Sequence, residues 1–80
     1  MDLDTYAALV QRILNKTVRS NESIPSVEFN QRVKALGMAC NPPVSISSQK
    51  IHKIMTALGF PVQRGAGNVG YYHGLSWKPN

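Results

Sequence analysis

The chain has 80 residues, enough for one small domain and too few for a second lobe that would form an interdomain cleft. Hydrophobic residues make up 42% of it and charged residues 16%, the composition of a folded domain and not of a disordered tail. Nine Lys and Arg against four Asp and Glu give a formal charge of +5. This charge indicates a polyanionic partner, nucleic acid before an anionic membrane surface.

The first predicted element is a helix over about residues 5–18. Apolar side chains recur there at helical spacing, and Asp2 or Asp4 is available as the N-cap. The longest uninterrupted apolar run, residues 6–10, is too short for a signal or membrane segment. We therefore expect no insertion into a membrane.

A second helix is predicted over about residues 26–36, after a polar linker that ends in Pro25. Gly37 follows at the place of a left-handed C-terminal residue, and Met38 is expected to fold back on the helix. Paired prolines then make residues 39–46 an extended connector.

The third helix, residues 47–58, has the clearest pattern. Ser47 is the expected N-cap, an apolar stripe at i, i+3, i+4 and i+7 begins at Ile51, and Gly59 ends the helix. The opposite surface is polar, basic and free of acid, as in helices that contact phosphates or base edges in a major groove. Its residues are Ser48, Gln49, Lys50, His52, Lys53 and Thr56. A solvated helix face is the alternative interpretation.

Residues 61–77 are predicted to form a β-hairpin around the glycine-rich turn 65–70. The turn reads GxGxxG, but it lies between strands and not before a helix, so it is not a dinucleotide fingerprint. The second strand is expected to cover the helices with one face. The residues of that face are Tyr71, His73, Leu75 and Trp77.

Charge is unevenly distributed along the chain. All four acids lie in the first 28 residues, whereas cations alone follow. These later cations are Arg32, Lys34, Lys50, Lys53, Arg64 and Lys78. One side of the molecule is therefore expected to carry the positive field.

Enzymatic and metal-binding functions find little support in the sequence. His52, His73 and Cys40 lack the spacing of a metal site, and no carboxylate pair or nucleophile with its base stands out. We therefore expect no enzyme and no cofactor. The lone cysteine cannot form an internal disulfide, which favours an intracellular location, in the cytoplasm or nucleoid, with the nucleus also open.

The order of a helix, a turn, a second helix with a polar face and a basic hairpin is that of a winged helix-turn-helix. Residues 26–37 (SVEFNQRVKALG), 48–60 (SQKIHKIMTALGF), Arg64 and 70–75 (GYYHGL) carry a further resemblance. They look like the winged-helix domain that closes the primase-helicase replication proteins of phages, plasmids and large DNA viruses. The resemblance covers about residues 24–77, and it implies a groove-reading helix and a basic wing.

Residues 1–80 are therefore predicted to be a single α+β winged helix-turn-helix domain, with three helices followed by a two-stranded wing. Its expected partner is double-stranded DNA at an origin or other replication site, with further domains or subunits of a replication protein. Helix 47–58 would lie in the major groove and hairpin 61–77 would be the wing. Contacts outside that helix are expected from Arg64, Lys34 and Lys78.

Two other functions stay open at this point. In the first, the domain is a protein-interaction winged helix of a replication or transcription complex, and the polar face of the third helix meets another protein. In the second, single-stranded nucleic acid stacks on Tyr71, Tyr72 and Trp77.

Overall fold

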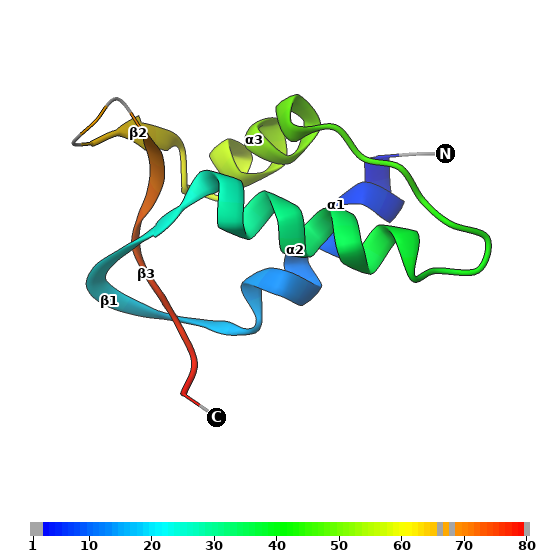
Figure 1. The fold of residues 1–80 in the computed structure, drawn as a ribbon, viewed down its shortest axis with the longest axis horizontal. Coiled ribbons are helices and arrows are strands. Elements are labelled where there is room, and N and C mark those ends of the chain that lie inside the picture. Colours follow the sequence, from blue (N-terminus) through cyan, green and yellow to red (C-terminus); the bar gives the residue numbers. More distant parts are fainter. Residues whose placement is uncertain (1–2, 66, 68, 80) are drawn as a thin grey trace.

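The computed structural model describes residues 3–65, 67 and 69–79, and the side chains of the expected N-caps Asp2 and Asp4 lie outside the described part. Over these described residues the fold is α+β, with three helices and a three-stranded antiparallel sheet. The elements in chain order are α1 (Leu3–Leu14), β1 (Thr17–Pro25), α2 (Ser26–Met38), α3 (Ser48–Ala57), β2 (Val62–Arg64) and β3 (Gly70–Trp77). Figure 1 shows the sheet at one end of the helices, with α3 above α2 and the C-terminus below.

The predicted hairpin is present, because β2 pairs antiparallel with β3, but the expected strand count was wrong, because a third strand joins the sheet. α1 ends at Leu14, and the segment expected as its last turn and as a polar linker is β1. β1 pairs along β3, from Thr17 opposite Trp77 to Pro25 opposite Tyr71, which makes β3 the central strand. The hydrogen bonds that stabilise this segment come from a strand far along the chain, so its polar local pattern did not reveal it.

The end of α2 also differs from the prediction. Gly37 is helical and buried, and the helix continues to Met38, which is exposed and does not fold back. A Cβ atom at Gly37 would lie 2.5 Å from the carbonyl oxygen of Val44, and the Val44 N–H donates to the Gly37 carbonyl at 2.8 Å. The glycine is therefore needed so that the connector can approach the helix, and not for a left-handed backbone.

The signals at both ends of α3 are confirmed. The Ser47 hydroxyl accepts a hydrogen bond from the Lys50 N–H at 3.2 Å, as an N-cap does. Gly59 has φ 95°, and the Phe60 N–H donates to the Met55 carbonyl at 2.8 Å, which closes the C-terminus. These local bonds fix the length of the helix, and its apolar stripe fixes its rotation on the core.

The core lies between the three helices and the sheet. Phe29 of α2 and Tyr72 of β3 are its largest fully buried side chains, and their rings meet edge to face with centroids 5.1 Å apart. Among the residues whose burial is described, the buried apolar set is Leu9, Val10, Ile13, Ile24, Phe29, Val33, Val44, Ile46, Ile51, Ile54, Met55, Tyr72 and Leu75. Side chains from every element except β2 belong to this set, so the helices are held to the sheet by a single core.

The predicted inward face of β3 is confirmed for Leu75, which is buried, and for Trp77, which packs against the core, but not for Tyr71 and His73. Tyr72 and Leu75 are buried, whereas His73 is exposed and Tyr71 is half-buried. Gly74 has φ 85°, and the pairing with β1 shifts register in this region. This irregularity lets two core residues lie three positions apart, which a regular strand does not allow.

Candidate nucleic-acid interface

The outward face of α3 carries three of the predicted residues. Gln49, Lys53 and Thr56 recur at i, i+4 and i+7 opposite the buried stripe, and all three are exposed. The Thr56 hydroxyl donates to the His52 carbonyl at 2.8 Å, which leaves its oxygen as an acceptor. The face therefore offers an amide, a hydroxyl oxygen and an ammonium group, with no carboxylate in the helix.

A polar groove lies beside this face, between α2 and α3. The Lys34 ammonium donates to the Ser48 hydroxyl at 2.9 Å, so these two predicted residues are brought together. His52 lies half-buried in the same groove. The hollow measures about 300 Å³ and is lined by Ser26, Val27, Asn30, Gln31, Lys34, Ser48 and His52. Donors from two helices thus converge here.

A hydrogen-bonded chain fixes the His52 ring. The hydroxyl of fully buried Tyr72 donates to Asn30 Oδ1 at 3.0 Å, and Asn30 Nδ2 lies 2.9 Å from His52 Nε2. An amide nitrogen can only donate, so we assign Nε2 as the acceptor and place the ring proton on Nδ1. Burial of the ring, and then the nearby Lys34 ammonium, lower the pKa of His52 below 6.5. His52 is thus a neutral imidazole whose Nδ1 N–H can donate a hydrogen bond.

Asn30 was missed in the sequence, although a signal for it exists. Ser26, Phe29, Asn30 and Val33 follow the spacing i, i+3, i+4 and i+7, which places the amide on the buried side of α2. A buried amide needs partners, and Tyr72 and His52 supply them. Burial raises the pKa of Tyr72, so its phenol stays protonated and remains a donor.

The lowered pKa of His52 gives a pH-dependent contribution to stability. Its stabilising effect is complete above the unfolded-state value of 6.5 and is lost as the pH falls through the lower folded-state pKa. The free energy of unfolding should therefore decrease more in the wild type than in His52→Gln between about pH 7.5 and pH 5.5. Urea denaturation at the two pH values measures this. A decrease in His52→Gln as large as that in the wild type would contradict the assignment.

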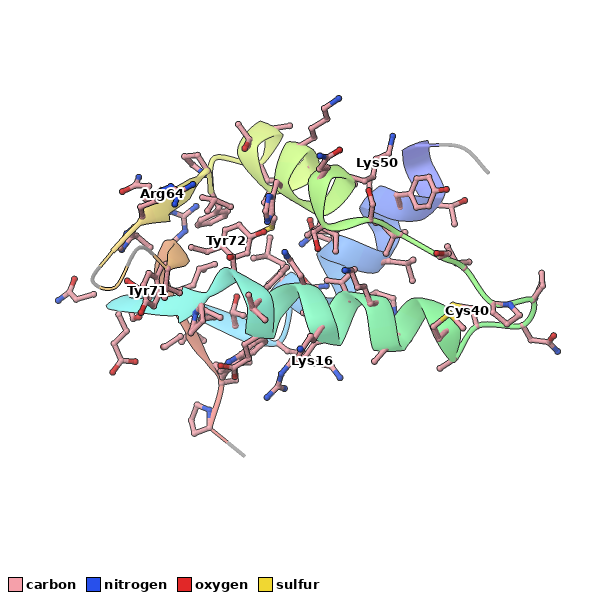
Figure 2. The ribbon with its side chains drawn as sticks, turned by 45° about the horizontal axis from the view of Figure 1, so that its top comes forward. Lys16, Cys40, Lys50, Arg64, Tyr71 and Tyr72 are labelled. Atoms are coloured by element: carbon pink, nitrogen blue, oxygen red, sulfur yellow. The ribbon has the colours of Figure 1, made fainter. Side chains whose placement is uncertain are left out.

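Lys50 and Arg64 flank α3 at its two ends. The Lys50 ammonium lies 5.7 Å from the centre of the Tyr6 ring, so this side chain leans toward α1 and away from the α2–α3 groove. Arg64 is exposed at the end of β2, opposite Gly70. Figure 2 shows both on the upper side of the molecule, at opposite ends of α3. The cationic surface around this helix is therefore broader than the helix itself.

Lys78 does not join these residues. Its N–H donates to the Lys16 carbonyl at 2.9 Å, and Figure 2 shows Lys16 on the lower side, away from Lys50 and Arg64. The expectation of one positive side was thus wrong, because folding sends the cations after residue 29 to two sides. A contact from Lys78 to DNA bound along α3 has no geometric support.

The aromatic side chains offer few open ring faces. Tyr72 is buried, and the Trp77 indole stacks on Phe29 with centroids 6.0 Å apart. The Arg32 guanidinium lies over the Trp77 ring, 4.0 Å from its centre. Tyr71 is half-buried. Stacking of unpaired bases would need these contacts to be replaced.

Comparisons with protein-family models, with curated protein sequences and with solved structures give no match for this chain. Among the described residues, no group of three or more His, Cys, Asp and Glu side chains could hold a metal ion. No helix in the described ranges is long and apolar enough to cross a membrane.

Proposed function

We propose that the chain is a winged helix-turn-helix domain that binds double-stranded DNA as the DNA-binding part of a larger replication protein. The observation that carries this proposal is the acid-free outward face of α3, which lies beside a groove of polar donors from α2. Amide, ammonium and imidazole donors can bond the acceptor edges of bases in a major groove or phosphate oxygens. The replication context rests on the resemblance of residues 24–77 alone.

In this proposal each element has a distinct role. α2 and α3 form the helix-turn-helix, with the extended connector as its turn, and α3 enters the major groove. β2 and β3 form the wing, from which Arg64 reaches a phosphate or the adjacent minor groove. β1 adds a third strand that ties the wing to the helices through its pairing with β3.

The number of cations near α3 sets the expected affinity. Lys34, Lys50, Lys53 and Arg64 would neutralise at most four phosphates, which gives a slope of log K against log salt of about −3 to −4. Affinity should then fall roughly 100-fold between 50 and 200 mM salt. Binding by one domain is therefore weak at physiological salt, and specificity requires a dimer, repeated sites or tethering to other domains.

The decisive experiment is fluorescence anisotropy of the wild type with random-sequence duplex and with matched single-stranded DNA, over a range of salt. We expect the duplex to bind more tightly. Lys53→Ala should weaken binding roughly threefold to tenfold and reduce the salt slope by about 1, because one phosphate contact is lost. Arg12→Ala removes an exposed cation from α1 and should change neither quantity. No duplex binding at low salt, or an unchanged affinity in Lys53→Ala, would overturn the proposal.

A second candidate function is protein binding, and one observation favours it. A groove of about 440 Å³ runs between α1 and α3. Its lining is mostly apolar and is made by Ala7, Gln11, Lys50, Lys53, Ile54, Ala57 and Leu58. The apolar lining residues would suit the apolar face of an amphipathic helix, and the two lysines would suit acidic side chains of the same helix. Failure of the domain to bind duplex even at low salt would favour this second function.

A further inference from the structure

Three cations gather on the side of the molecule opposite α3. Lys16, Arg32 and Lys78 are exposed there and surround Trp77, and we call this set the lower basic face. These side chains line a hollow of about 350 Å³, together with Asn15 and Pro79. Figure 2 places Lys16 on the lower side, and Figure 1 places the C-terminal end of β3 there too.

Backbone pairing brings the two lysines together. The Lys78 N–H donates to the Lys16 carbonyl at 2.9 Å, just beyond the paired residues Thr17 and Trp77. Like charges at adjacent positions of neighbouring strands repel each other, and a bound anion would relieve that repulsion. Lys16 also follows the C-terminus of α1, where carbonyl groups favour a cation, but this does not account for Lys78.

Arg32 and Trp77 complete the face. Glu28 accepts a hydrogen bond from Trp77 Nε1 at 2.8 Å and lies 3.8 Å from the Arg32 guanidinium. The Arg32 side chain nevertheless remains 52% exposed above the indole ring. Glu28 is the one carboxylate among these described contacts, so the lower basic face keeps a net positive charge.

We propose that the lower basic face is a second nucleic-acid site, which binds the phosphates of a separate segment while α3 faces the first. Its lysine and arginine groups suit phosphate oxygens, which identify the backbone and not the sequence. The two sites lie on opposite sides of a domain whose extents are 37 × 28 × 20 Å. A short straight duplex cannot reach both, so the domain would bridge two segments. The bridging role rests on the proposed function, whereas the phosphate site does not.

The single tryptophan of the chain makes the second site observable by itself. Trp77 lies in the lower basic face, so its indole N–H signal in a nitrogen-15 NMR spectrum should shift when a short duplex is added at low salt. The shift should persist in Lys53→Ala. It should fall at least fivefold in Lys16→Gln/Lys78→Gln, whereas the amide signals of Gln49 and Lys53 should still move. Lys16→Arg/Lys78→Arg keeps both charges and should behave as the wild type.

Bridging is tested by retention of a labelled duplex on an immobilised duplex. The wild type should retain it, and Lys16→Gln/Lys78→Gln should lose at least tenfold of the retention, with its affinity for one duplex reduced less than threefold. Duplex binding that leaves the Trp77 signal unmoved would overturn the second site and leave the proposed function standing. A Trp77 shift without movement of the α3 amides would support the second site and overturn the α3 interface. If Lys16→Gln/Lys78→Gln still retains the labelled duplex, bridging comes from self-association of the domain, and the bridging proposal is overturned.

Discussion

Phe29→Ala is expected to lower the free energy of unfolding by about 3–5 kcal/mol. The ring is fully buried and contacts Tyr72 edge to face and Trp77 by stacking, so it joins α2 to two residues of β3. The loss is a large fraction of the ~5–15 kcal/mol that stabilises a small domain. Part of the Phe29→Ala population should therefore be unfolded at 37 °C or below.

Urea denaturation, followed by circular dichroism and by Trp77 fluorescence, measures this loss. Val27→Ala is the control, because Val27 lies in the same helix and the residue is 61% exposed. Its free energy of unfolding should change by less than about 0.5 kcal/mol. A loss below about 1 kcal/mol in Phe29→Ala, or equal losses in the two variants, would show that the ring does not hold the sheet to the helices.

The sequence was informative where structure is determined locally. α3 has its N-cap, its apolar stripe and its terminal glycine within one short segment, and all three were identified correctly. β1 has no such signals, because its partner strand lies some 50 residues further along the chain. The role of Gly37 depends on the approach of Val44, and the register of β3 depends on a bulge, so neither could be found from periodicity.

In the candidate site, too, the features determined within one helix were predicted, and those that depend on neighbouring elements were not. Periodicity correctly placed Gln49, Lys53 and Thr56 on the exposed side of α3. It did not show that neighbouring helices divide the remaining polar residues of that helix, with Lys50 leaning toward α1 and His52 toward α2. Lys78 shows the limit most clearly, because only the pairing of strand ends reveals which side of the molecule it occupies.

α2 links the core to the candidate interface through two adjacent residues. Phe29 points into the core, and Asn30 connects the buried Tyr72 hydroxyl to the His52 ring in the α2–α3 groove. The position of the imidazole therefore depends on Asn30, which is buried and also lines the groove. A change at Asn30 should alter both stability and recognition, and the two effects can be separated.

Asn30→Leu is expected to lower the free energy of unfolding by about 2–4 kcal/mol, because the Tyr72 hydroxyl is left buried without an acceptor. Tyr72→Phe alone should cost about 1 kcal/mol, since it removes one hydrogen bond. The loss in the double variant Asn30→Leu/Tyr72→Phe should be smaller, by at least about 1 kcal/mol, than the added losses of the two single variants, because both polar partners are then absent. Urea denaturation measures these losses. If the losses of the two single variants simply add in the double variant, the hydrogen bond between Tyr72 and Asn30 is contradicted.

The same double variant tests what the fixed His52 ring does in recognition. Without Asn30, nothing described in the structure holds the proton on Nδ1, whereas Lys53 and Arg64 keep their places on the surface. We expect its affinity for random-sequence duplex, and the salt slope of that affinity, to stay within about twofold of the wild type, because phosphate contacts set both. Its preference for duplexes selected for tight binding to the wild type, over random-sequence duplex, should decrease roughly tenfold. This is the contribution of one specific base contact. Equal losses for selected and random duplexes would show instead that His52 contacts the phosphate backbone.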